Sequence, residues 1–179
     1  SQATMVKSIV SLISENLREA ENDRYRKRKD LLSRSDNSSK FLPFRIYYAT
    51  DKDYIISDIL FYYFNAVKET FIKDNIFLWD LNGRKNPDNI LQTSVGYEGL
   101  LKILVDILEF EKIDVENLSV KTFKIYLKKA EDIDLSNQNL FPFSTKGKNI
   151  LYNTISLKIW PELPNSSKDT RQEFLRSTI

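Results

Sequence analysis

The stretch DKDYIISDILFYYFNAVKETFIK, residues 51–73, decides the fold of this chain. It contains no glycine or proline, and apolar side chains recur at three- and four-residue steps on nearly every side of the predicted helix. A helix that is apolar almost all round has to be buried, so we expect this one at the centre of the core. Thr50 and Asp53 predict a capping box at its start. Its apolar residues are Tyr54, Ile55, Ile59, Phe61, Tyr62, Tyr63, Ala66, Val67 and Phe71.

Upstream, the spacing of apolar residues predicts an amphipathic helix over residues 3–20. No glycine or proline stops it before Pro43, so it could run on toward Leu32. Thirty helical residues span about 45 Å, slightly more than a globule of this size is wide. The helix must therefore break, project or pack on another subunit, and we expect a long N-terminal helix or arm over residues 1–34.

The next two segments predict connections. Residues 33–40, SRSDNSSK, are polar and rich in side chains that compete for backbone hydrogen bonds, which favours a loop. Residues 41–49, FLPFRIYYA, predict an extended segment, and Pro43 places it at a sheet edge or in a linker.

Three more helices are expected downstream, over residues 95–110 with Ser94 as cap, 119–130, and 146–160. Gly96 and Gly99 indicate close backbone packing. The lysines expected on the outer side of the 119–130 helix are Lys121, Lys124, Lys128 and Lys129. The pattern predicts an all-α fold: an irregular bundle of about five helices around a central aromatic-rich helix, with at most a short extended segment. We expect one helical domain over residues 1–164 and a C-terminal tail over 165–179.

The composition of the 179 residues excludes several kinds of chemistry. The chain has no histidine and no cysteine. Cys- and His-dependent zinc sites, thiol nucleophiles, disulfides and triads with an imidazole base are therefore excluded. We expect no catalysis in this chain, no cofactor and no metal site.

Charge is uneven along the chain. Residues 1–50 carry ten basic and six acidic side chains, whereas residues 51–179 carry 17 basic and 19 acidic ones. The basic run RYRKRK, residues 24–29, can place guanidinium and ammonium groups on phosphates. The alternative is a solvated helix face, because acids such as Asp23 and Asp30 stand four residues from a cation. The nucleic-acid candidates in this run are Arg24, Arg26, Lys27, Arg28 and Lys29.

A second candidate anion site is STKGK, residues 144–148, where free backbone N–H groups at a helix start join Lys146 and Lys148. It lacks the Walker A glycine and residue order, and the alternative is that Ser144 or Thr145 simply caps the helix. Two groups of carboxylates could in principle bind a metal ion: Asp51 with Asp53, and the acids of residues 131–134. We favour helix capping for the first pair and predict no metal site.

The chain has no run of 18 apolar residues and no uncharged apolar leader, so we expect no membrane contact. Absence of cysteine fits a reducing interior, and we expect a cytoplasmic protein. The start at Ser1-Gln2 suggests a tag remnant or an excised piece of a longer protein.

Four segments, residues 1–9, 62–71, 89–101 and 144–148, resemble in order and spacing the C-terminal region of DGQHR-domain proteins, the group that includes the DNA-sulfur-modification-associated DndB proteins. The resemblance covers about residues 1–160. It implies a bacterial setting, a link to DNA modification or defence, and DNA contact or regulation. The Asp-Gly-Gln-His-Arg motif cannot occur without histidine. The resemblance therefore implies a C-terminal helical piece separated from its ParB-like part, and no catalytic residue is carried over.

The function expected is a non-catalytic helical module that supports DNA binding or assembly, with DNA bound through the basic arm. The alternative is a protein-interaction or dimerisation domain that makes no DNA contact and self-associates through the N-terminal helix. An enzymatic interpretation would require clustered carboxylates with a divalent ion.

Overall fold

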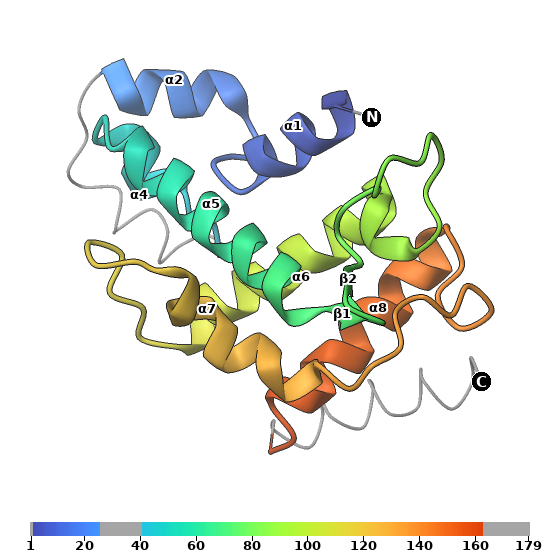
Figure 1. The fold of residues 1–179 in the computed structure, drawn as a ribbon. Helices are drawn as coiled ribbons and strands as arrows, with labels where there is room; N and C mark the ends of the chain where they lie inside the picture. Colours follow the sequence, from blue (N-terminus) through green and yellow to red (C-terminus); the bar gives the residue numbers. More distant parts are fainter. Residues whose placement is uncertain (1, 26–40, 163–179) are drawn as a thin grey trace. The chain divides into compact units, whose positions relative to one another are not determined.

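The computed structural model describes residues 2–25 and 41–162 (Figure 1). These residues are mainly helical and contain one small antiparallel sheet, which confirms the all-α class. The α-helices are α1 (Gln2–Ser11), α2 (Leu17–Tyr25), α4 (Arg45–Ala49), α5 (Asp53–Thr70), α6 (Ser94–Phe110), α7 (Val120–Leu127) and α8 (Thr145–Ile159). The short elements are strands β1 (Ile72–Lys73) and β2 (Ile76–Phe77) and 3-10 helices η1 (Ile90–Gln92) and η2 (Lys128–Ala130).

Within the predicted single domain, the described residues form two compact units. The first unit combines residues from 1–61 with 105–118, and the second combines residues from 62–104 with those from 119 onward. Helices α5 and α6 each contribute one part to either unit. The first unit thus holds α1, α2 and α4, and the second holds the sheet, α7 and α8.

The helix expected over residues 3–20 is interrupted at residues 12–16, so its predicted continuity is wrong. The Ser14 hydroxyl accepts from the Asn16 N–H at 3.0 Å and donates to the Asn16 carbonyl at 2.7 Å. The Asn16 side chain then accepts from the Glu19 N–H at 3.3 Å, at the start of α2. Side chains that compete with the backbone end one helix here and begin the next.

Two expectations around residues 41–53 are also wrong. Residues 45–49 form the helix α4 instead of an extended segment, and the buried Phe44 before it donates its N–H to the Leu12 carbonyl at 3.1 Å. Thr50 does not cap α5. Its hydroxyl bonds back to the Ile46 carbonyl at 2.7 Å, and Asp51 turns the chain with a φ of 57°.

Helix α5 supplies buried apolar side chains to both units. In the first unit Ile55 and Ile59 are buried, and in the second unit Tyr63 and Val67 are buried. The Tyr63 hydroxyl donates to the Leu100 carbonyl at 2.7 Å. The buried face is narrower than predicted, however, because Tyr54 and Phe61 are exposed.

The other predicted helices are confirmed with small shifts at their ends. Helix α6 begins at Ser94, so the prediction of Ser94 as its cap is wrong by one residue: the Thr93 hydroxyl caps the helix by accepting the Gly96 N–H at 3.1 Å. A Cβ at Gly96 would lie 1.9 Å from the Ile90 carbonyl oxygen, which confirms close backbone packing there. Helix α7 begins after a capping box of Ser119 with Thr122.

Candidate functional site

Arg24 of the predicted basic arm lies in the last turn of α2 and is held by two carboxylates. Its Nη2 lies 2.8 Å from Asp53 Oδ2 and its Nε lies 3.0 Å from Asp51 Oδ1. The Tyr48 ring lies beneath the guanidinium, 4.6 Å from its carbon. The hydrogen bond to Asp53 is the largest cause that raises the pKa of Arg24, with both carboxylates adding to it. The positive charge of Arg24 is therefore largely balanced by its own unit.

The other four arm residues, Arg26, Lys27, Arg28 and Lys29, lie outside the described residues, and their role stays a prediction. Asp23, the residue before Arg24 in the sequence, forms a buried ion pair with Arg45. Arg45 of α4 places Nη2 at 2.6 Å from Asp23 Oδ2 and at 3.1 Å from Glu19 Oε1, both on α2. These contacts hold α2 alongside α4 (Figure 1).

The two lysines predicted at the start of α8 have different environments. Lys148 places Nζ 2.6 Å from Glu98 Oε2, and its side chain is only 18% exposed. Lys146 is exposed. The Ser144 hydroxyl accepts from the Gly147 N–H at 3.4 Å, so the capping interpretation is confirmed. Of the two lysines, only Lys146 remains accessible to an anion.

The four aspartates among the candidate metal ligands, Asp51, Asp53, Asp132 and Asp134, are paired with cations or with donors of their own loop. Asp134 accepts from the Ser136 hydroxyl and from Lys73, and these bonds, the serine first, lower the pKa of Asp134. The hydrogen bond from Lys158 to Asp132 at 2.6 Å lowers the pKa of that carboxyl. Among residues 2–25 and 41–162, no three potential metal-ligating side chains converge.

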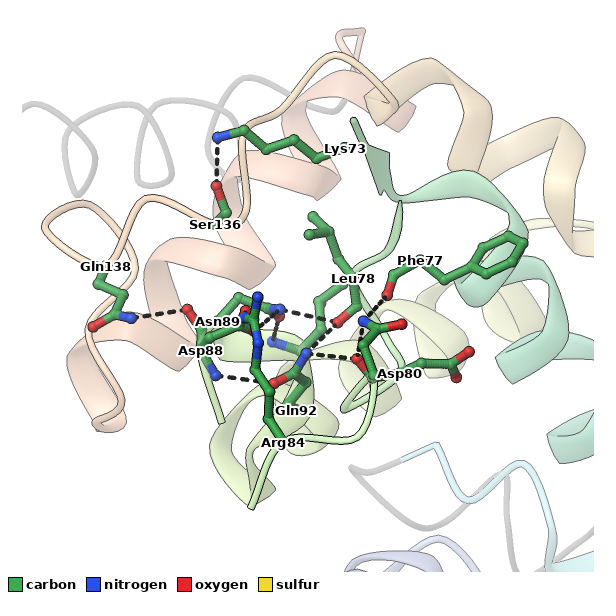
Figure 2. A network of polar contacts seen from close by, with 12 residues as sticks. Lys73, Phe77, Leu78, Asp80, Arg84, Asp88, Asn89, Gln92, Ser136 and Gln138 are labelled. Atoms are coloured by element: carbon green, nitrogen blue, oxygen red, sulfur yellow. Dashed lines mark hydrogen bonds and ion pairs between the residues drawn. The ribbon is translucent and has the colours of Figure 1, made fainter. Parts of the chain in front are cut away.

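Amide side chains close the loop between β2 and α6 (Figure 2). Asn89 Nδ2 donates to the Leu78 carbonyl at 3.0 Å, and Gln92 Nε2 donates to the Asp80 carbonyl at 2.8 Å. Gln138 donates from a distant segment to the carbonyl of Asp88 at 2.8 Å. The network satisfies backbone carbonyls that would otherwise lack partners, so we interpret it as structural.

Helix α7 and η2 carry the most one-sided charge in the second unit: residues 119–130 hold four lysines and no acid. Lys124 pairs with Glu69 at 3.0 Å, and Lys129 donates to the Ile159 carbonyl at 3.2 Å. Lys121 and Lys128 are exposed, and Ile125 between them is 53% exposed. We call Lys121, Ile125 and Lys128 the α7 lysine face.

The sequence predicted exposed lysines on this helix but did not single them out as binding residues. The sequence pattern that could have marked them is the spacing of these lysines at helical intervals in a segment, residues 119–130, that contains no acid. Of the sequence-predicted cations, Arg24 belongs to the first unit, and Lys146 and Lys148 belong to the second.

A cavity of about 520 Å³ opens in the first unit beside Phe41, Tyr47 and Leu108, against the turn of residues 111–115. Burial, followed by the charge of Glu116, raises the pKa of Tyr47. The cavity mixes apolar walls with charges of both signs, and its lining does not define one class of ligand.

Comparisons with protein-family models, with curated proteins and with solved structures found no match. Every helix of the described ranges is too short or too polar to cross a bilayer.

Proposed function

We propose that this chain is a non-catalytic helical module of a bacterial, cytoplasmic DGQHR/DndB-like protein and that it supports DNA binding or assembly. The observation that carries the proposal is the distribution of charge. The carboxylates that could have formed a reactive site, such as Asp53 and Asp134, are paired with cations, whereas lysines such as Lys121, Lys128 and Lys146 are exposed. Exposed cations suit a polyanion better than a reaction centre.

The family assignment rests on the sequence resemblance. The proposal includes the arrangement expected from it, with the helices packed around the aromatic-rich α5. It also includes the basic arm at residues 24–29, which would add to the cations of the described residues. Arg24 would serve as the fixed base of this arm, because Asp51 and Asp53 already bind it.

Fluorescence anisotropy of a labelled DNA duplex, titrated with the whole chain at several salt concentrations, tests the proposal. If the four arm cations at positions 26–29 contact phosphates, the logarithm of the affinity should fall with the logarithm of the salt concentration at a slope of about −3.6. Absence of binding at about 50 mM salt, where such contacts are strong, would remove the DNA role.

The alternative function is self-association through the N-terminal helix, and one observation favours it. Helix α1 has an apolar stripe, yet none of its residues is buried, and Val6 is 59% exposed. Sedimentation at several protein concentrations tests this function. A concentration-dependent dimer that Val6→Ser weakens would support it, and a strict monomer would exclude it.

A further inference from the structure

We propose that the α7 lysine face contacts the phosphate backbone of double-stranded DNA, with Lys121 and Lys128 as the contacting cations. The inference rests on the proposed DNA function and assigns part of that function to the second unit. It does not depend on the residues of the basic arm.

Lys121 lies in the first turn of α7, and Lys128 is the residue directly after α7, at the start of η2, where its N–H still donates to the Lys124 carbonyl. Positions 121, 125 and 128 are separated by four and three residues, so their side chains share a helix face. Seven residues at the helical rise place Lys121 and Lys128 about 10.5 Å apart along the axis. That separation is close to the width of the major groove, about 12 Å, so two flexible lysine stems can reach phosphates on both of its sides.

The helix is fixed in place from its opposite side. Phe123 and Leu127 are completely buried, and the Phe123 ring packs edge-on against Tyr63 with ring centres 5.5 Å apart. Lys124 and Lys129 are engaged with Glu69 and with the last carbonyl of α8. The core therefore presents the exposed lysines to a partner without a cost for ordering the helix.

An ordinary solvated face would surround its lysines with acids. Other lysines of the second unit have such partners: Lys68 pairs with Asp80, Lys73 with Asp134 and Lys158 with Asp132. Residues 119–130 contain no acid, and the nearby Glu69 already binds Lys124; the first acid that follows along the chain is Glu131, three residues after Lys128. The charge left on this face is complementary to a line of phosphates.

The same face is poorly suited to a membrane surface. An interfacial helix inserts a broad apolar side into the lipid. The large apolar side chains Phe123 and Leu127 of α7 are committed to the core, and Ile125 is the apolar member of the exposed face. DNA, whose phosphates accept contacts from lysine side chains without any apolar insertion, is the partner that this chemistry fits.

Lys121→Gln/Lys128→Gln in the whole chain tests the inference by duplex anisotropy against salt. We expect the affinity to fall on the order of 10- to 60-fold at about 0.1 M salt and the salt slope to become less steep by about 1.8. The matched control is Lys85→Gln/Lys112→Gln, which removes the same charge from two other exposed lysines and should change both quantities much less. Lys121→Arg/Lys128→Arg should retain binding, because the charge is kept.

Circular dichroism spectra and thermal midpoints of the variants should match those of the wild type, since all four lysines are exposed. If the wild type binds DNA and the α7 variant behaves like its control, the inference fails while the proposed function stands. If the wild type binds no duplex, or binds only phosphatidylserine-containing vesicles, both fail.

Discussion

Arg45 Nη2 lies 2.6 Å from Asp23 Oδ2, and the Asp23 side chain is only 2% exposed. This pair joins α4 to α2 inside the first unit. A second nitrogen of the guanidinium donates to the Ser14 hydroxyl at 3.3 Å, in the segment between α1 and α2. One buried cation therefore contacts both the break in the N-terminal helix and the helix α2 that follows it.

Replacing Asp23 by alanine should destabilise the chain by about 3 kcal/mol, because it leaves the buried Arg45 charge without its best partner. Glu19→Ala is the control: Glu19 binds the same guanidinium but is half exposed, so its loss should cost less than about 1 kcal/mol. Urea unfolding followed by circular dichroism measures both changes. Equal costs for the two variants would contradict the importance of burial.

Gly96→Ala should destabilise the chain by about 2–3 kcal/mol, because the new Cβ would lie 1.9 Å from the carbonyl oxygen of Ile90 and the backbone would have to move. Gly99→Ala is a matched control in the same helix. Its Cβ would meet the flexible end of Leu151 at 3.1 Å and the Lys148 carbonyl oxygen at 3.3 Å, a much milder crowding that the higher helix propensity of alanine, worth about 1 kcal/mol, opposes. The free energies of unfolding should therefore separate the two glycines, and a similar loss at both would show that the Ile90 contact does not limit this position.

The paired carboxyl of Asp134 makes stability depend on pH in the acid range. Because the folded state lowers the pKa of Asp134 below its ordinary value of 3.8, the carboxylate contributes stability above that pH, and the contribution is lost as pH falls through the folded pKa. In Asp134→Asn the urea midpoint should be lower than in the wild type at neutral pH, and the difference should shrink below about pH 4.

Ser136→Ala should change the pH dependence in the same direction, because the Ser136 hydroxyl is the largest cause of the lowered pKa. Urea midpoints measured from pH 7 down to about pH 2 provide the comparison. A difference between Asp134→Asn and the wild type that stays constant over this range would contradict a lowered pKa.

The sequence predicts the helices whose ends are marked by local chemistry. Ser119 and Ser144 cap α7 and α8 as their positions indicate, since a capping side chain needs only its own next three residues. The break after α1 and the helix α4 depend instead on distant partners. Phe44 bonds to Leu12, and Arg45 pairs with an acid 22 residues away, which no local pattern encodes.

In the candidate site too, the contacts that the sequence does not predict are those between segments far apart in the chain. Asp23 reads in the sequence as a surface partner of Lys27 at the next turn of a helix, yet the structure buries it against Arg45. The acids at positions 51 and 53 suit the first turn of a helix, and the structure shows them binding Arg24 across the unit. Spacing along one helix predicts which side chains share a face, but it cannot predict which of them a second segment neutralises.

At the start of α8, replacing Lys148 should affect stability, whereas replacing Lys146 should affect only anion binding. Lys148→Gln should lower the free energy of unfolding by about 1 kcal/mol, because the partly buried Glu98 loses its partner. Lys146→Gln should leave stability unchanged, since Lys146 is exposed.

If this helix start contacts DNA, Lys146→Gln should also make the salt slope less steep by about 0.9. Urea unfolding and duplex anisotropy on the same two proteins measure both effects. An unchanged slope in Lys146→Gln would leave Ser144, Gly147 and Lys148 with a purely structural role.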